Sequence, residues 1–204
     1  MTKYEGQDHY LDSEAGVLKD KLGIKDADEL KKAEASLVAW RSFQLSEKPI
    51  QGRFDLEHLK AIHKHLFGDV YEWSGKLRNI DLAKGDSYFA NHRQIISAAR
   101  PIFEKLAAEN YLNGLDAAGF SERAAYYLGE INALHPFRDG SGRVQREFIN
   151  HLAYQNGYFI DWTNVNQEEM LQAAMESFRK SNNTKFATLI RDNLRKLPAS
   201  NSAE

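Results

Sequence analysis

The stretch of sequence that decides the fold reads HPFRDGSGRVQR and spans residues 135–146. It begins with a histidine before a proline, passes through a turn that contains Gly140 and Gly142, and ends with two arginines. One helix that ends near Leu134 and another that begins in this turn would leave backbone N–H groups unpaired at the positive end of a helix. Such a place binds phosphate, so the pattern predicts an anion-binding turn between two helices.

The side chains of this stretch suit nucleotide chemistry. Arg143 and Arg146 are three positions apart, so both project from one face of the helix toward an anion in the turn. Asp139 is a candidate ligand for Mg²⁺, which is often held by one or two carboxylates together with substrate phosphates. A histidine such as His135 can change its charge near neutral pH, so this residue could take a proton from an attacking hydroxyl. Each residue alone is more often structural, but together they predict a protein that handles a nucleotide triphosphate.

The composition fits a soluble globular protein. The chain has 204 residues, of which 42% are hydrophobic and 27% charged. A formal net charge of −2 lacks the basic excess of a duplex-binding surface, so we expect no direct nucleic-acid ligand. The absence of cysteine excludes disulfides and thiolate metal sites and suits the bacterial cytoplasm. We expect no signal peptide in the first thirty residues and no membrane helix, because no apolar run approaches about 18 residues.

The chain is predicted to be mainly α-helical, because long segments rich in Ala, Leu, Glu and Lys contain few glycines and prolines. Ser121 is expected to cap one helix and Gly157 to end another. The segment 79–89 is the exception, since apolar residues flank Lys84-Gly85-Asp86 as in a short β-hairpin. The expected helices span residues 26–45, 54–67, 95–110, 121–134, 141–156, 167–177 and 184–197.

Two other features are interpreted as structural. The basic run in residues 178–197 is typical of a solvated helix face, with a contribution to nucleotide or target binding as the alternative. Five histidines show no metal-ligand spacing, so we expect surface or partly packed positions for them. These histidines are His58, His63, His65, His92 and His151.

The central stretch resembles the signature of the Fic family, HPFx(D/E)GNGRxxR, with Ser141 where the family usually has Asn. The sequence VYEWSGKLR at residues 70–78 is similar to the segment before the family's flap, and the expected hairpin falls where that flap should be. The sequences KYEG at 3–6 and LGIKD at 22–26 resemble the bacterial toxin branch, which includes Fic domains of type IV secretion effectors.

The resemblance covers most of the chain, from about residue 4 to residue 197, and implies a single Fic domain over residues 1–204. The implied fold is a mainly α helical bundle with a short β-hairpin flap over the active site. Its core would span about 54–177, after an N-terminal helical extension at 1–50. A C-terminal helix at 184–197 and a loose tail at 198–204 would follow.

The resemblance implies a protein adenylyltransferase, which transfers AMP from ATP to a hydroxyl side chain of a target protein and uses Mg²⁺. His135 would be the general base and Asp139 would hold Mg²⁺. Phe137 would anchor the loop in the core, and Arg138 would be exposed without a role. The ATP phosphates would be bound by Gly140, Ser141, Gly142, Arg143 and Arg146.

The flap is expected to pair with the backbone of the target so that its hydroxyl lies in line with the α-phosphorus. Phe89 would either clamp the target side chain or only pack the hairpin, and both interpretations stay open. Ser141 offers one short hydroxyl donor where Asn would offer an amide, so activity is expected to be retained but reduced. The flap consists of Lys84, Gly85, Asp86, Ser87, Tyr88 and Phe89.

Many Fic proteins are inhibited by a glutamate from an (S/T)xxxE(G/N) helix that pairs with the second arginine of the signature, here Arg146. Ser200 and Glu204 alone have this spacing in the chain, but the trailing Gly or Asn is missing. We therefore expect the inhibitory helix on a separate small antitoxin. The toxin branch suggests type II topoisomerase subunits, DNA gyrase and topoisomerase IV, as targets.

Three alternatives remain open at this stage. The chain could act on a host protein such as a small GTPase, if it is translocated into another cell as part of an effector. It could use another phosphate-containing donor than ATP. It could also be a non-catalytic binding module, although the intact histidine, aspartate and arginines of the signature argue against that function.

Overall fold

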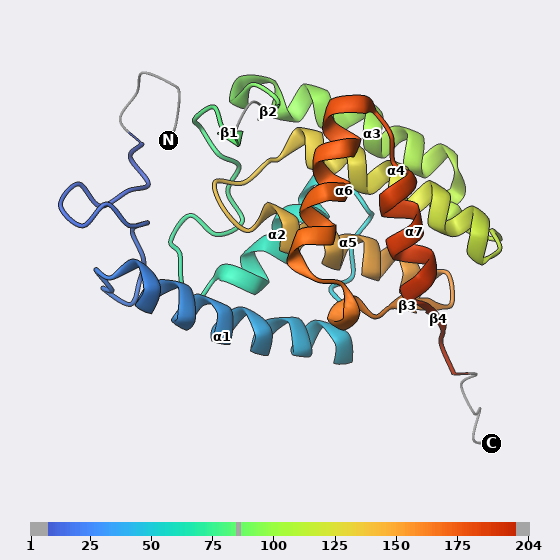
Figure 1. Cartoon of the computed structure of the whole chain (residues 1–204), viewed down its shortest axis with the longest axis horizontal. Helices are drawn as coiled ribbons and strands as arrows, with labels where there is room; N and C mark the ends of the chain where they lie inside the picture. The colour runs from blue at the N-terminus through green and yellow to red at the C-terminus, as the bar shows by residue number, and fades with distance from the viewer. Residues whose placement is uncertain (1–7, 85–86, 199–204) are drawn as a thin grey trace.

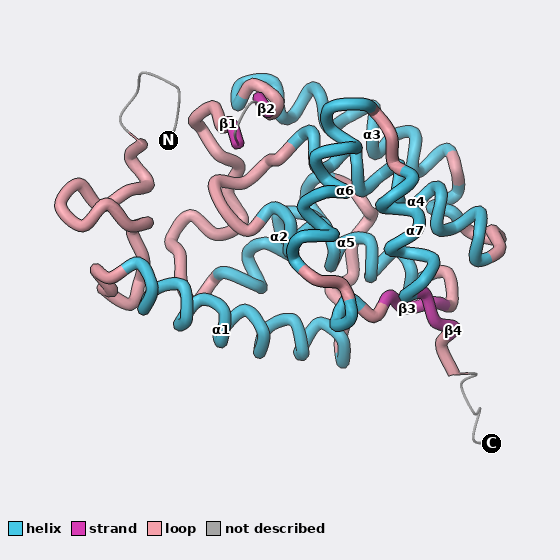
Figure 2. The backbone as a smooth tube through the Cα atoms, viewed as in Figure 1, coloured by secondary structure: helices cyan, strands magenta, loops and turns pink. Residues whose placement is uncertain are grey.

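A computed structural model describes residues 8–84 and 87–198, and this part of the chain is mainly α-helical, as predicted (Figures 1 and 2). Its two short antiparallel sheets lie at the margins of the helices. The α-helices are α1 (Ala27–Glu47), α2 (Leu56–Phe67), α3 (Ile95–Ala108), α4 (Ala117–Leu134), α5 (Ser141–Gln155), α6 (Gln167–Lys180) and α7 (Thr184–Asn193).

The helices α4 and α5 form the centre of the bundle. Helix α4 packs against α3, α5, α6 and α7, and α5 packs against α2. Helix α1 contacts α2 and runs along one edge of the molecule (Figure 1). Aromatic side chains such as Phe120, Tyr127 and Phe148 are completely buried between these elements. The stretch 135–146 therefore joins the two central helices, and its loop is held from several sides.

Aspartates begin three of the helices. The side chain of Asp26 accepts from two N–H groups of α1, and Asp55 accepts from the third residue of α2. The expectation that Ser121 caps a helix is wrong, because α4 begins earlier and its cap is Asp116, five residues before Ser121. Ser121 lies inside α4, where its hydroxyl donates to the carbonyl of Ala117 at 2.7 Å.

The predicted hairpin is present as β1 (Ala83–Lys84) and β2 (Ser87–Tyr88), which pair antiparallel. Its turn residues Gly85 and Asp86 lie outside the described residues. Among the described residues, no helix is both long enough and apolar enough to cross a membrane.

The predicted helix at 184–197 is too long. Helix α7 ends at Asn193, and the chain continues as β4 (Leu194–Lys196), which pairs antiparallel with β3 (Tyr158–Ile160). Ile160 is opposite Leu194 in this register, and the carbonyl of Asn193 accepts from Asp161 N–H at 3.0 Å. Hydrogen bonds to a distant segment thus replace the last turn of the helix. The predicted tail at 198–204 falls mostly outside the described residues.

Candidate active site

Two left-handed residues frame the loop between α4 and α5. His135 ends α4 with a φ of 42°, and Gly140 begins α5 with a φ of 76°. A Cβ atom on Gly140 would lie 2.3 Å from the Cζ of Phe67, so both the backbone conformation and the space require glycine there. The loop between α4 and α5 consequently has only six residues, 135–140, and the N-terminus of α5 faces it.

Ser141 and His63 hold the loop in this shape. The Oγ of Ser141 lies 3.3 Å from both the N–H and the carbonyl oxygen of Phe137. His63 Nε2 lies 3.2 Å from the carbonyl oxygen of Asp139, and its Nδ1 accepts from Gly75 N–H at 2.7 Å. These partners require an Nε2–H tautomer. Burial lowers the pKa of His63 to about 4, so the imidazole that supports the loop is neutral.

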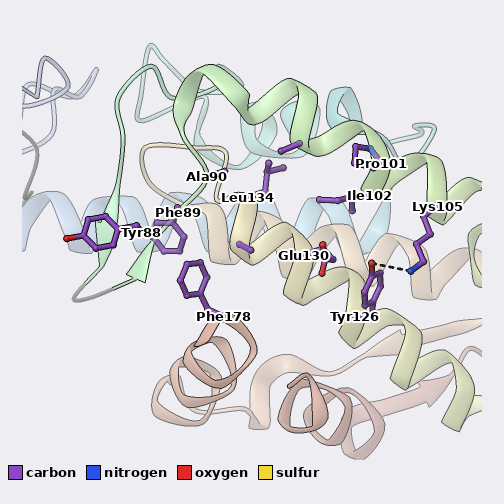
Figure 3. A pocket seen from close by; sticks show the side chains of 12 residues that line it. Tyr88, Phe89, Ala90, Pro101, Ile102, Lys105, Tyr126, Glu130, Leu134 and Phe178 are labelled. Carbon is purple, nitrogen blue, oxygen red and sulfur yellow. Dashed lines mark hydrogen bonds between the residues drawn. The ribbon is translucent and has the colours of Figure 1, made fainter. Parts of the chain in front are cut away.

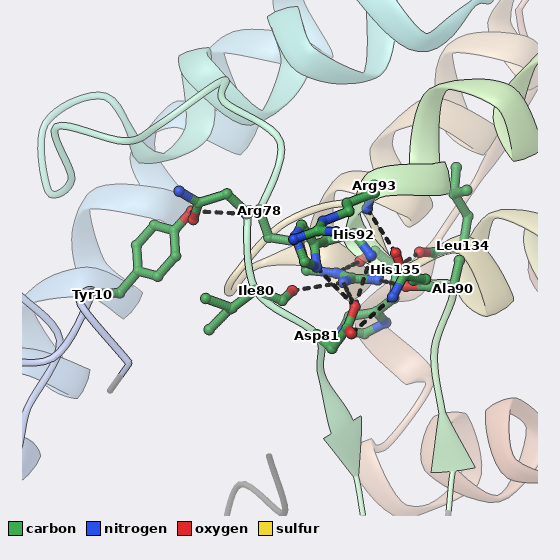
Figure 4. A network of polar contacts seen from close by, with 11 residues as sticks. Tyr10, Arg78, Ile80, Asp81, Ala90, His92, Arg93, Leu134 and His135 are labelled. Atoms are coloured by element: carbon green, nitrogen blue, oxygen red, sulfur yellow. Dashed lines mark hydrogen bonds and ion pairs between the residues drawn. The ribbon is translucent and has the colours of Figure 1, made fainter. Parts of the chain in front are cut away.

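Arg78 connects the end of α4 to both sides of the flap (Figure 4). Its buried guanidinium donates to the carbonyls of His135 and Ile80, both at 2.8 Å, and to that of Ala90. A longer contact of 3.4 Å reaches the carbonyl of Leu134. A cation at the negative end of α4 is electrostatically favourable, and the same cation fixes the position of the flap relative to His135.

The acidic and basic residues of the signature lie on the α5 side of the loop. Asp139 is 43% exposed, and its Oδ1 lies 3.3 Å from Nη2 of Arg143. The same nitrogen lies 2.6 Å from Oε1 of Glu34 on α1. Burial lowers the pKa of Arg146, and the neighbouring charge of Arg143 lowers it further. Two guanidinium groups and the positive end of α5 thus gather at one place, which is suited to a polyanion.

Phe89 lies against the histidine of the signature. The ring centroids of Phe89 and His135 are 3.9 Å apart with nearly parallel planes, and Phe178 meets Phe89 edge-on. Phe89 thus packs against the imidazole of His135, and a clamp on the target side chain stays a prediction. Tyr88 is 49% exposed beside it. The flap strand β2 therefore brings its aromatic end directly to His135.

A groove of about 510 Å³ begins at Phe89 and continues between α3, α4 and α6 (Figure 3). Its floor is mainly apolar, and Lys105 and Glu130 are its charged residues. None of the described residues that line it comes from α5, which carries the two arginines. The groove is therefore separate from the two arginines, and Phe89, which lines it, stacks on His135.

Several sequence predictions need correction. Arg138 is not an exposed residue without a partner, because its guanidinium lies 2.7 Å from Asp8 and is 16% exposed. His58, His63 and His151 are not surface residues but are almost completely buried. The imidazole rings of these three histidines can be buried because each has a hydrogen-bond partner or an aromatic neighbour within the core.

Other predictions on packing agree with the structure. Phe137 is completely buried and stacks on His63 at 4.0 Å. The structure adds that Tyr71 and Trp73, in the segment before the flap, are also buried and stack on each other at 4.3 Å. In the basic run, Lys185 forms an ion pair with Glu176 on the neighbouring helix at 3.0 Å, which fits a solvated helix face.

Sequence reasoning missed Glu34, His63 and Arg78 as residues of the site. Glu34 had a signal, because it interrupts the apolar spacing of Leu30 and Val38 on the buried side of α1. Arg78 lies in the segment that resembles the one before the flap, but nothing in the sequence indicates that its guanidinium is buried. The contacts of His63 with the loop connect positions 76 residues apart, which a single sequence does not reveal.

A helical bundle with a flap at a histidine and two arginines at a helix N-terminus defines a phosphate-handling protein. The chain belongs to the Fic/DOC family, whose model matches residues 53–153. It is 37% identical over 170 residues to the probable protein adenylyltransferase Fic of Escherichia coli K12. This aligned region covers 83% of this chain and 84% of that relative. The family predicted from the signature is thus confirmed.

Another relative is the protein adenylyltransferase VbhT of Bartonella schoenbuchensis, which is 52% identical over 195 residues. The match covers 95% of this chain but spans only 41% of VbhT. The crystal structure of BepC from Bartonella tribocorum, a VirB-translocated effector with bound AMPPNP, has a TM-score of 0.85 at 27% identity. It covers 93% of this chain and 97% of BepC. The enzyme class predicted from the sequence agrees with the names of the two sequence relatives.

Proposed function

We propose that this chain is a protein adenylyltransferase that transfers AMP from ATP to a hydroxyl side chain of a target protein. The observation that carries the proposal is the arrangement around one short loop. His135 stands at the end of α4, while Asp139, Arg143 and Arg146 lie on the α5 side. A base and a polyanion site therefore share one loop, as nucleotidyl transfer requires. The names of the sequence relatives and the AMPPNP bound to BepC support the same activity.

The reaction follows from these positions. The target hydroxyl oxygen attacks the α-phosphorus of ATP while His135 takes its proton. A new oxygen–phosphorus bond forms, and the bond from the α-phosphorus to the bridging oxygen breaks. Pyrophosphate leaves with the electron pair of that bond. Arg143, Arg146 and the N–H groups at the start of α5 stabilise the negative charge that develops on it.

Asp139 is the residue that would hold Mg²⁺. Its side chain is partly exposed, and no cluster of three or more metal-binding side chains occurs in the described part of the chain. A lone carboxylate fits Mg²⁺, because this ion is held mainly by substrate phosphates and water. When bound, it would neutralise part of the phosphate charge.

The flap would bind the target by adding a strand of the target to the β1–β2 hairpin. Lys84 and Ser87 are backbone members of this ladder, and Tyr88 presents an exposed ring beside them. The groove next to Phe89 offers room for a target segment, since it lies away from the arginines. A target held in this way would present its hydroxyl to His135.

Regulation in trans is part of the proposal. A small antitoxin would insert the glutamate of an (S/T)xxxE(G/N) helix at Arg146 and so block binding of the γ-phosphate. Glu204 lies outside the described residues and supplies no support for inhibition within the chain. Mixing the chain with such an antitoxin should stop transfer. Binding without inhibition, or inhibition that persists after Arg146→Ala in a variant with residual activity, would contradict this mechanism.

The proposed targets are type II topoisomerase subunits in the bacterial cytoplasm. A host protein becomes the alternative if the chain is part of a translocated effector, a setting that BepC exemplifies among the structural relatives. A binding module without activity remains the alternative from another class.

The test compares ATP labelled at the α-phosphorus with ATP labelled at the γ-phosphorus. Each is incubated with the chain, Mg²⁺ and either bacterial lysate or purified gyrase and topoisomerase IV subunits. Adenylylation transfers only the α-label to protein, whereas phosphate transfer would transfer only the γ-label.

Two variants serve as controls. His135→Ala should abolish labelling, whereas the exposed His9→Ala should leave it intact. Absence of label with every target and without any inhibitor would favour the binding module. Label that survives His135→Ala would remove the histidine from its proposed role.

A further inference from the structure

Glu34 is an acidic residue in an apolar stripe. It lies on α1 one turn from Leu30 and one turn from Val38, and all three face the interior of the protein. Only 9% of the residue is exposed. A carboxylate in such a place loses favourable hydration and is retained only with strong partners. The buried carboxylate of Glu34 therefore needs partners that offset its lost hydration.

Both oxygens of Glu34 have partners from the region around the loop. Oε1 lies 2.6 Å from Nη2 of Arg143, and Oε2 accepts a hydrogen bond from the hydroxyl of Tyr71. Burial and the bond to Glu34 raise the pKa of Tyr71, so this phenol stays protonated and donates. Tyr71 is itself fixed by stacking on Trp73. The carboxylate is thus held in one orientation before it meets the arginine.

Arg143 is held on its face as well as at its edge. Its guanidinium carbon lies 4.6 Å from the centroid of the Phe67 ring, which packs under the loop at Gly140. Glu34 and Asp139 both approach the same nitrogen, Nη2. The N–H donors on Nε and Nη1 are not used by these two carboxylates. One end of the guanidinium is therefore anchored while its other donors can serve a phosphate.

The charges around Arg143 explain why an anchor is needed. Arg143 lies in the first turn of α5, where the positive end of the helix disfavours a cation. Arg146 is a second cation nearby, and burial together with the charge of Arg143 lowers the pKa of Arg146. A nearby carboxylate offsets both effects. Without Glu34, Arg143 would lose its shorter ion pair and keep the longer contact with Asp139 and the face contact with Phe67.

We propose that Glu34 is a positioning residue that aims Arg143 at the phosphates of the bound nucleotide. The inference rests on the proposed function, because it assigns Glu34 an effect on transfer through Arg143. Negative charge on the departing pyrophosphate grows in the transition state, so a misplaced guanidinium should affect the transfer step more than nucleotide binding. If the carboxylate of Glu34 instead competed with the nucleotide phosphates for Arg143, it would slow transfer in the unmodified protein, and its removal would raise kcat.

The first experiment measures kcat and KM for ATP in Glu34→Gln and Glu34→Ala, with unfolding curves to verify that both variants fold. Glu29→Gln, an exposed acid on the same helix, is the matched control and should behave like the unmodified chain. We expect kcat to fall about tenfold to hundredfold in Glu34→Ala, with KM changed by less than about threefold. Glu34→Gln should fall less, because its amide oxygen still accepts from Arg143. An unchanged or raised kcat would overturn the inference.

The second experiment separates positioning from a general structural role. Glu34→Ala is combined with Arg143→Ala, and the losses in kcat are compared as a double-mutant cycle. If Glu34 acts through Arg143, its removal should cost nothing more once Arg143 is gone. Losses that multiply would overturn the proposal even if each variant is folded.

Assays of the unmodified chain separate a failure of the proposed function from a failure of the proposed role of Glu34. If it transfers no AMP, the proposed function fails and the role of Glu34 falls with it. If it transfers AMP and the Glu34 variants match it, only the inference fails.

Discussion

At the scale of single residues, Ser141 shows how a departure from the family signature is accommodated. Its hydroxyl is directed at Phe137 of the loop, and only 2% of the residue is exposed. Ser141→Ala would leave the buried N–H of Phe137 without this partner and should reduce the free energy of unfolding by about 1–2 kcal/mol. Urea unfolding measures the change. Ser36→Ala, at an exposed serine of α1, should stay within about 0.5 kcal/mol of the unmodified protein.

The same position tests the expected effect of serine on activity. Because the hydroxyl closes the loop, Ser141→Asn must replace those contacts as well as offer an amide to phosphate. We still expect the asparagine variant to transfer AMP faster, as the signature implies. Equal turnover in the two proteins would show that this position does not limit the rate.

Arg78 provides a second prediction at this scale. Its removal by Arg78→Met would leave the carbonyls of His135, Ile80 and Ala90 without a buried donor. The free energy of unfolding should fall by about 3 kcal/mol, measured by urea unfolding. Arg93→Met, at an exposed neighbour, is the control and should have little effect. A loss as small as that of the control would show that water replaces the guanidinium.

At the scale of elements, buried histidines between α2 and α5 make the fold sensitive to mild acid. His58 Nε2 lies 3.2 Å from His151 Nδ1, so one proton is shared in a hydrogen bond between two neutral rings. Burial lowers the pKa of His58, and it lowers the pKa values of His63 and His151 to about 4. Each folded pKa lies below the ordinary value of 6.5, so the unfolded chain takes up these protons first as the pH falls.

The stability that depends on these neutral rings is therefore complete above about pH 6.5 and is lost as the pH falls toward 4. His63 and His151 should each lower the free energy of unfolding by about 1.4 kcal/mol per pH unit as the pH falls within this window. Urea unfolding at pH 7.5, 6 and 5 tests the slope. His151→Gln should reduce the slope by the contribution of one histidine, whereas Ser36→Ala, which removes no titratable group, should not change it. A flat profile in the unmodified protein would contradict the prediction.

Sequence periodicity was sufficient for most helices but not for their ends. Leu59, Ile62 and Leu66 place α2 correctly because their spacing reports a buried face directly. The end of α7 was missed, since Leu194–Lys196 leaves the helix only because a strand from another part of the chain is available to pair with it. Local propensity carries no information on such a partner.

The same difference between local and long-range information applies to the residues of the candidate site. The signature located His135, Asp139, Arg143 and Arg146, since a contiguous motif is readable along the chain. Glu34 reaches Arg143 from a position 109 residues earlier, and Arg78 reaches the end of α4 from before the flap. These buried charges depend on tertiary packing, so composition and spacing predict neither their burial nor their partners.

At the scale of the whole molecule, nucleotide binding should stabilise the complete fold. The proposed phosphate site lies where α1, α5 and the central loop meet, so a ligand bound there would have to be released before the bundle unfolds. Free ATP with Mg²⁺ at a hundred times its Kd should raise the free energy of unfolding by about 2.7 kcal/mol. Thermal unfolding with and without ATP measures this effect.

The variants separate binding from chemistry in that experiment. His135→Ala should keep the thermal shift because the histidine is proposed to act on the target hydroxyl. Arg146→Ala should lose most of the shift, whereas Arg143→Ala should lose only a small part of it, because the Arg143 guanidinium is proposed to act mainly on the departing pyrophosphate. A shift that is unaffected by either arginine variant would place the nucleotide phosphates elsewhere on the protein.

The bracing of the loop by Ser141, His63 and Arg78 has a thermodynamic consequence for ligand capture. Ordering a backbone residue costs about 1–2 kcal/mol of conformational entropy, and here that cost falls on folding instead of on association. The nucleotide would therefore bind to a preformed site, and most of the conformational entropy lost on binding would be that of the nucleotide itself. Calorimetry should accordingly find a small heat-capacity change on binding, in contrast to a protein that folds a loop around its ligand.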